Sequence, residues 1–235
     1  MELQDARVLV CGASGALGGQ VADALLARGA RVVAAGRDAG RLAEVAGRCS
    51  TEPLVFDAVD AESCATTVAA AAVQLGGLDG LVVCVGVAGF GRAMDADDAV
   101  VEELFAVDVL GPMALVRAAS AQFGDDREGL PFVAVLSAIL ADVPTAGMAE
   151  YSAAKSALAT WLHVVRREER RRLTVIDVRP PHLDTGLDGR ALAGEPPRLP
   201  APQPSAAVVE AILEAVRTDA REVVWDAGAG ALVVR

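Results

Sequence analysis

The 235-residue chain has one lysine, one tyrosine and two histidines, and aromatic residues make up only 3% of it. Its four cysteines, Cys11, Cys49, Cys64 and Cys84, form no C-x-x-C pair and have no metal-like pairing with the histidines, so we expect reduced, buried thiols and no metal. No apolar run approaches the ~18 to 20 residues of a membrane helix, and the first residues lack the pattern of a signal peptide. We therefore expect a cytoplasmic protein with no membrane partner.

The charge balance excludes another class of partner. The formal net charge is -11, which argues against binding to nucleic acid. All of the 21 basic residues except Lys155 are arginines. Because arginine has been acceptable at every other basic position, the one lysine stands out as a candidate for a role that arginine cannot fill.

Short apolar runs rich in β-branched residues recur along the chain, with helix-like segments between them. The runs lie at 6–12, 30–36, 53–58, 80–86, 131–137, 173–180 and 222–227. They are apolar throughout rather than alternating, which is typical of strands covered on both faces. The helix-like segments include 17–29, 62–76 and 100–122. This alternation predicts one α/β domain over 1–235, a doubly wound parallel sheet of about seven strands with helices on both faces.

Residues 181–204 interrupt the alternation, because they are rich in proline and glycine. A strand precedes this segment, and a helix and a strand follow it, so a linker between domains is not indicated. The functional interpretation is a lid over the substrate, and the alternative is a surface loop without a role.

The sequence "CGASGALGG" follows the first strand directly and leads into a helix. Glycines in such a turn allow the backbone to approach a pyrophosphate closely, and the helix N-terminus presents free N–H groups to it. We expect a dinucleotide to be held by five residues of this turn, namely Gly12, Ser14, Gly15, Leu17 and Gly18.

The end of the second strand indicates which dinucleotide binds. A carboxylate that accepts from the ribose 2′-hydroxyl is typical of NAD sites, but here Gly36 stands at that place and Arg37 follows. A guanidinium can pair with a 2′-phosphate, so NADP(H) is favoured over NAD(H). The neighbouring Asp38 leaves the NAD(H) alternative open.

Tyr151 and Lys155 stand four residues apart, a spacing that places both on one face of a helix. Together with the glycine turn, this Y-x-x-x-K pair resembles the short-chain dehydrogenase/reductase family over nearly the whole chain. The resemblance implies a Rossmann fold and a reaction in which a carbonyl is reduced, or an alcohol oxidised, with NADP(H). It implies that Tyr151 is the general acid/base and that Lys155 lowers its pKa and holds the nicotinamide ribose.

The resemblance also assigns further cofactor contacts. Asp57 matches the family aspartate at the adenine, with Ala58 next to it; "VCVG" occupies the place of the family's NNAG motif and supplies Val85 and Gly86. The segment after the sixth strand supplies three residues near the nicotinamide, namely Pro180, Leu183 and Thr185. Two motifs depart from the pattern, because Ala16 replaces the middle glycine of the turn and only Gly86 remains of NNAG.

The family's catalytic group is an Asn-Ser-Tyr-Lys tetrad, and its first two positions differ here. Asp108 stands at the asparagine position, and Ala138 stands thirteen residues before Tyr151, where the serine belongs. Ser137 is adjacent, and it could replace the serine only if the loop carries one extra residue, because neighbouring strand residues face opposite sides. Asp108 and Ser137 are candidate catalytic residues on this basis.

Two functions follow. The first is an NADP(H)-dependent reductase for an apolar small molecule, whose site is expected to include Ile139, Leu140, Val143, Met148 and Leu187. The second is a catalytically impaired NADP(H)-binding protein with a regulatory or scaffold role. The resemblance implies a homodimer or homotetramer. His163 and His182 are expected to be surface or packing residues.

Overall fold

The structure is a computed structural model that describes residues 1–124 and 129–235. Its strands are β1 (Arg7–Cys11), β2 (Arg31–Gly36), β3 (Leu54–Val55), β4 (Gly80–Val83), β5 (Phe132–Leu136), β6 (Thr174–Arg179), β7 (Glu222–Asp226) and β8 (Ala231–Val234). Its α-helices are α1 (Ala16–Leu26), α2 (Ala39–Cys49), α3 (Ala61–Leu75), α4 (Asp98–Phe105), α5 (Gly111–Ser120), α6 (Ala149–Glu168) and α7 (Ser205–Thr218).

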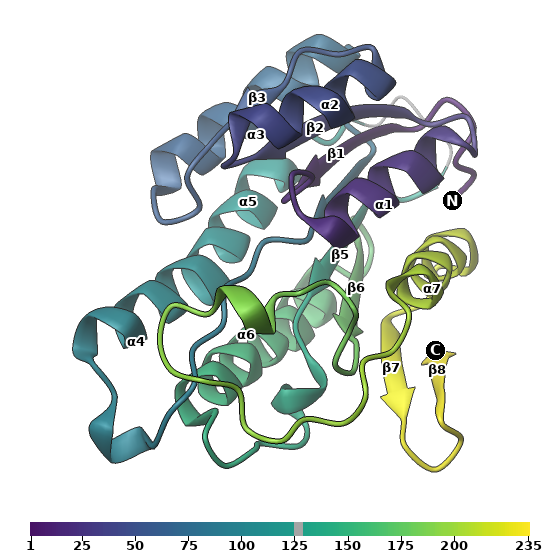
Figure 1. Cartoon of the computed structure of the whole chain (residues 1–235). Helices are drawn as coiled ribbons and strands as arrows, with labels where there is room; N and C mark the ends of the chain where they lie inside the picture. Colours follow the sequence, from purple (N-terminus) through teal and green to yellow (C-terminus); the bar gives the residue numbers. More distant parts are fainter. Residues whose placement is uncertain (125–128) are drawn as a thin grey trace.

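The strands form one sheet in the order β3-β2-β1-β4-β5-β6-β7-β8 (Figure 1). All neighbouring strands are parallel except the last pair, in which β8 runs antiparallel to β7. The chain therefore winds outward in both directions from β1 and β4, and ligands of such sheets bind at this switch point, beyond the carboxyl ends of the strands.

The predicted doubly wound α/β fold is confirmed, with one strand more than the seven apolar runs indicated. The additional strand, β8, pairs with β7 across a tight turn in which the Asp226 carboxylate accepts hydrogen bonds from the backbone N–H groups of Gly228 and Ala229. Its four residues are too few, and too close to β7, to be distinguished as a separate run in the sequence.

Helices cover both faces of the sheet, as the continuous apolar strands predict. On one face α1, α2 and α7 pack on residues such as Val8 and Val10 of β1, and on the other face α3, α5 and α6 pack on Leu9 and Cys11. Figure 1 shows α1 and α7 on the opposite side of the sheet from α5 and α6. The two faces of each central strand are thus buried in two separate cores.

The predicted helix 100–122 is divided into three parts. α4 ends at Phe105, residues Ala106–Leu110 form one turn of π-helix (η2), and α5 continues from Gly111 with Pro112 in its first turn. Such wide turns inside α-helices are frequent at functional sites. Here the π turn carries Asp108, which is completely buried.

The segment 181–204 has little regular structure, but backbone bonds hold it at two places. At its base, Gln203 N donates to His182 O (2.8 Å) and Asp184 N donates to Gln203 O (3.1 Å). At its tip, Leu192 N donates to Ala88 O (2.7 Å) and Phe90 N donates to Ala193 O (2.9 Å). Within the described residues, no helix is both long enough and apolar enough to cross a membrane.

Candidate active site

A cavity of about 390 Å³ opens at the carboxyl ends of β1, β4, β5 and β6, the place that the strand order marks for a ligand. One part of it lies against the glycine turn and the other part against the segment 181–204. The cavity is lined by all five apolar residues expected for the substrate, which are Ile139, Leu140, Val143, Met148 and Leu187. Its walls therefore suit an apolar molecule of modest size.

The turn between β1 and α1 leaves no room for side chains at its two outer glycines. Gly12 has φ +85°, and a Cβ there would lie 2.7 Å from the backbone of Cys84; a Cβ on Gly18 would lie 2.3 Å from Gly12 O. Asp38, Asp60 and Asp97 cap the N-termini of α2, α3 and α4 with their side chains, but Gly15 provides no such cap for α1. The first N–H groups of α1 are thus available to a pyrophosphate, which is the group the turn fits.

Most of the predicted cofactor residues lie together around this cavity. Those that line it are Gly15, Leu17, Gly18, Val85, Gly86, Tyr151, Lys155, Pro180, Leu183 and Thr185. Gly12 and Ser14 lie in the adjoining turn, where a Cβ on Gly36 would approach the Ser14 hydroxyl to 2.6 Å. The glycine at the end of β2 is therefore required by the close approach of the turn.

The remaining cofactor candidates follow β2 and β3, outside the lining of the cavity. The Arg37 side chain is exposed, and the structure gives it no partner among the described residues. Its neighbour Asp38 caps α2, accepting from Arg41 N (3.0 Å) and from Arg41 Nε (2.8 Å). Asp57 is exposed and Ala58 is buried. The carboxylate of Asp38 is thus engaged locally, whereas the guanidinium of Arg37 is available to a ligand.

Tyr151 and Lys155 lie one turn apart on α6, and both are buried, with 7% and 3% of their surface exposed. Lys155 Nζ lies 5.5 Å from the centroid of the Tyr151 ring. Burial raises the pKa of Tyr151, the Lys155 ammonium opposes this rise, and Asp108 adds to it. The pKa of Tyr151 is consequently above its ordinary value in the free protein.

Asp108 forms a buried ion pair with Lys155. Its Oδ1 lies 3.4 Å from Lys155 Nζ and accepts a hydrogen bond from Val87 N (3.0 Å), while its Oδ2 has no hydrogen-bond partner among the described residues. Burial raises the pKa of Asp108, and Lys155 offsets only part of the rise. Burial alone would lower the pKa of Lys155, but Asp108, Tyr151 and Asp177 together outweigh it and the pKa is raised. The charged form of Lys155 is therefore favoured in spite of its burial.

Ser137 lines the cavity, and its hydroxyl is engaged in a hydrogen bond within the protein. Ser137 Oγ donates to Asp177 Oδ1 on the neighbouring strand β6 (2.5 Å), and its side chain is buried. Ala138 instead packs in a small apolar cluster with Tyr151 and Met148. The position thirteen residues before Tyr151 thus presents a methyl group to the cavity, and catalysis by Ser137 stays a prediction.

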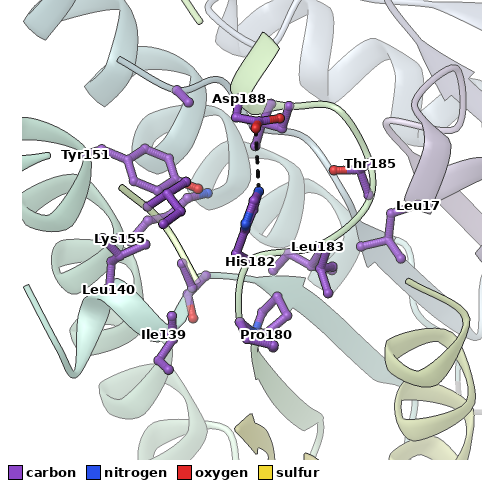
Figure 2. A pocket seen from close by; sticks show the side chains of 18 of the residues that line it. Leu17, Ile139, Leu140, Tyr151, Lys155, Pro180, His182, Leu183, Thr185 and Asp188 are labelled. Carbon is purple, nitrogen blue, oxygen red and sulfur yellow. Dashed lines mark ion pairs between the residues drawn. The ribbon is translucent and has the colours of Figure 1, made fainter. Parts of the chain in front are cut away.

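Sequence reasoning did not assign five polar residues that line the cavity, which are Thr145, His182, Asp188, Arg190 and Gln203. His182 was expected to be a surface or packing residue, yet its ring lines the cavity between Tyr151 and Thr185 (Figure 2). Its position two residues after Pro180 in the segment "RPPHLDT" was the available signal. No group of metal-binding side chains occurs in the part of the chain that the structure describes.

An open helix N-terminus at the switch point of the sheet, beside a buried tyrosine and lysine, is the arrangement of Rossmann-type oxidoreductases that use a nicotinamide dinucleotide. Comparison with known proteins narrows this class. The model of the short chain dehydrogenase family matches residues 6–195. The chain belongs to the short-chain dehydrogenase/reductase family.

Individual relatives agree with this assignment. The chain is 28% identical over 205 residues to dehydrogenase/reductase SDR family member 7B of Danio rerio, and 32% identical over 161 residues to 2-(S)-hydroxypropyl-CoM dehydrogenase 3 of Xanthobacter autotrophicus. The matches cover 82% and 66% of this chain, but only 66% and 62% of those two relatives.

The structure is also similar to that of a short chain dehydrogenase from Burkholderia cenocepacia in complex with NADP, with a TM-score of 0.80. The two chains are 26% identical, and the comparison covers 92% of each.

Proposed function

We propose that the protein is an NADP(H)-dependent reductase of carbonyl groups, or in the opposite direction an alcohol dehydrogenase, with an apolar small molecule as substrate. The observation that carries the proposal is the buried Tyr151–Lys155 pair at the wall of an apolar cavity beside the glycine turn. The only tyrosine and the only lysine of the chain meet at one site. This is hard to account for by packing alone.

Each residue of the pair has a defined task in the proposed reaction. The bound nicotinamide supplies or accepts the hydride. Tyr151 donates its hydroxyl proton to the carbonyl oxygen as the alcohol forms, and it takes the proton back when the alcohol is oxidised. Lys155 stabilises the tyrosinate by its charge, and it also holds the nicotinamide ribose. Pro180, Leu183 and Thr185 border the nicotinamide end of the cavity.

The proposed preference for NADP(H) depends on Arg37. Its guanidinium is exposed just after β2, and Asp38, the carboxylate that could select NAD(H), is engaged at the N-terminus of α2. We expect Arg37→Ala to weaken NADP binding about 10-fold or more, the effect of losing a charged hydrogen bond, and to leave NAD binding unchanged. Fluorescence titration with both dinucleotides measures this. An unchanged ratio of the two affinities would contradict the role of Arg37.

The reaction is tested by NADPH oxidation with a panel of 2-alkanones, cyclohexanones and aryl methyl ketones. We expect turnover by the unaltered protein and a loss of at least 100-fold in kcat for Tyr151→Phe, with the Kd for NADPH unchanged. Tight NADPH binding without turnover on the whole panel would refute the reductase.

The second candidate function is an NADP(H)-binding protein with a regulatory or scaffold role and little catalysis. It is favoured by the methyl group of Ala138 at the serine position and by the raised pKa of Tyr151. The same assay separates the two functions. Three further features belong to the proposal: a segment 181–204 that closes over the substrate, a homodimer or homotetramer, and a location in the cytoplasm.

A further inference from the structure

Outside the Tyr151–Lys155 pair, most of the polar side chains that line the cavity come from the segment 181–204. They are His182, Thr185, Asp188, Arg190 and Gln203. A cavity with apolar walls and a small number of placed polar groups selects its ligand by means of those groups. The chemistry of this segment therefore indicates what the substrate carries besides its carbonyl group.

The ring of His182 is held at one nitrogen and free at the other. Nδ1 lies 2.9 Å from Pro200 O. A carbonyl oxygen can only accept, so Nδ1 carries the proton of the neutral ring and Nε2 keeps its lone pair. The residues that the structure describes make no hydrogen bond to Nε2. His182 therefore presents a hydrogen-bond acceptor at its outer nitrogen.

Asp188 presents a second acceptor beside the first. Its Oδ2 lies 3.6 Å from His182 Nε2, which is beyond the length of a hydrogen bond. A carboxylate can only accept, so the two atoms cannot satisfy each other. The side chains of His182 and Asp188 are only 21% and 35% exposed. A ligand without a donor would displace water from both acceptors and leave them unpaired, which is unfavourable.

These two acceptors face the same cavity as Tyr151. Figure 2 shows the His182 ring between Tyr151 and Thr185, with Asp188 beyond its outer nitrogen. We infer that the substrate carries a hydroxyl or amino group in addition to its carbonyl, and that this group donates a hydrogen bond to His182 Nε2. His182 and Asp188 then select the substrate and take no part in the transfer of hydride or proton. The inference rests on the proposed reductase function and adds to it the class of substrate, an apolar hydroxy or amino ketone.

A set of acetophenones that differ in one substituent tests the selection. The substituents are hydroxymethyl, aminomethyl, ethyl and methoxy, each at the meta or the para position, and only the first two contain a donor. The assay is NADPH oxidation at about pH 8, where a free imidazole is neutral and an alkyl amine is charged. We expect kcat/KM for a donor-bearing ketone to exceed that of its ethyl and methoxy analogues about 10-fold or more. The better of the two donors distinguishes a hydroxyl from an amine.

Ratios of kcat/KM within each variant connect the preference to the ring nitrogen. His182→Phe keeps an aromatic ring without an acceptor, so the ratio of the donor-bearing ketone to its ethyl analogue should fall to about 1. His182→Gln keeps an acceptor and should retain part of the ratio. Asp188→Asn should lower the ratio of the aminomethyl to the hydroxymethyl ketone, because only the aminomethyl group is cationic.

The inference fails, and the reductase function stands, if Tyr151-dependent turnover shows no preference for a donor at either ring position. It fails equally if the methoxy ketone, which can accept but not donate, is preferred as strongly as the hydroxymethyl ketone. A preference that persists in His182→Phe would assign the selection to another residue and overturn the inference as well. A protein without Tyr151-dependent turnover on the whole set would overturn both.

Discussion

Replacing Asp108 with asparagine should destabilise the protein and alter the titration of its only tyrosine. Two unit charges 3.4 Å apart, the distance from Asp108 Oδ1 to Lys155 Nζ, attract by about 5 kcal/mol at an effective dielectric constant of about 20. Asparagine keeps the size of the side chain but removes the charge, and it leaves a buried ammonium without a partner. Breaking such a pair costs about 3 to 5 kcal/mol, which we expect as the decrease in the free energy of unfolding in urea.

A double-mutant cycle isolates the pair. Lys155→Met alone leaves a buried carboxylate unpaired, and the double variant removes both charges. The double variant should therefore be more stable than the sum of the two single effects predicts, by about 3 to 5 kcal/mol. If the effects add to within about 1 kcal/mol, Asp108 and Lys155 do not form the ion pair described above.

The same variant has a spectroscopic signature. Because Tyr151 is the only tyrosine, ultraviolet absorbance of tyrosinate against pH reports this residue alone. The negative charge of Asp108 raises the pKa of Tyr151, so its removal should move the tyrosinate midpoint to lower pH. Loss of the charge also lowers the pKa of Lys155, and the midpoint therefore belongs to the coupled pair. A midpoint that stays in place in Asp108→Asn would contradict the reasoning.

Two further substitutions test the geometry around the site. Ser137→Ala removes the donor to the buried carboxylate of Asp177 and should cost about 1 to 3 kcal/mol of stability with less than about 3-fold change in kcat; a 100-fold loss in kcat would instead make Ser137 catalytic. Gly18→Ala places a Cβ 2.3 Å from Gly12 O, so stability and NADPH affinity should both fall, as unfolding and titration measure. Its control, Gly47→Ala, meets no atom within 4 Å on α2 and should raise stability by about 0.5 to 1 kcal/mol.

The elements that the sequence predicted well are those whose signal is local. Continuous apolar runs indicated the buried strands, and the glycine turn and the pair Tyr151–Lys155 indicated the cavity. Each of these depends on residues only a few positions apart. The parallel order of the strands followed from the alternation with helices, since each crossover returns the chain to the same edge of the sheet.

The features that the sequence did not predict, or left open as it did the direction of Ser137, depend on contacts between distant residues. The π turn at Asp108 lies where its carboxylate meets Lys155, which is 47 positions further along the chain. Helical periodicity relates only residues a few positions apart, so it could not predict this contact. The direction of Ser137 depends on Asp177 of the adjacent strand. His182 lines the cavity because the segment after β6 turns back over the site. The composition of this segment predicted a lid or a surface loop, but not which of its side chains would line the cavity.

The contacts of the segment 181–204 decide how a molecule could leave the cavity. Its base is closed by the backbone bonds between Gln203 and residues 182 and 184, and Asp184 accepts from Ser205 N at the start of α7. Its tip is attached to residues 88–90 by two backbone bonds. Opening at the tip breaks only those two bonds and leaves Thr185 beside the anchored base. We therefore expect opening at the tip to expose the cavity beside Leu192 and to leave the walls formed by Pro180, Leu183 and Thr185 in place.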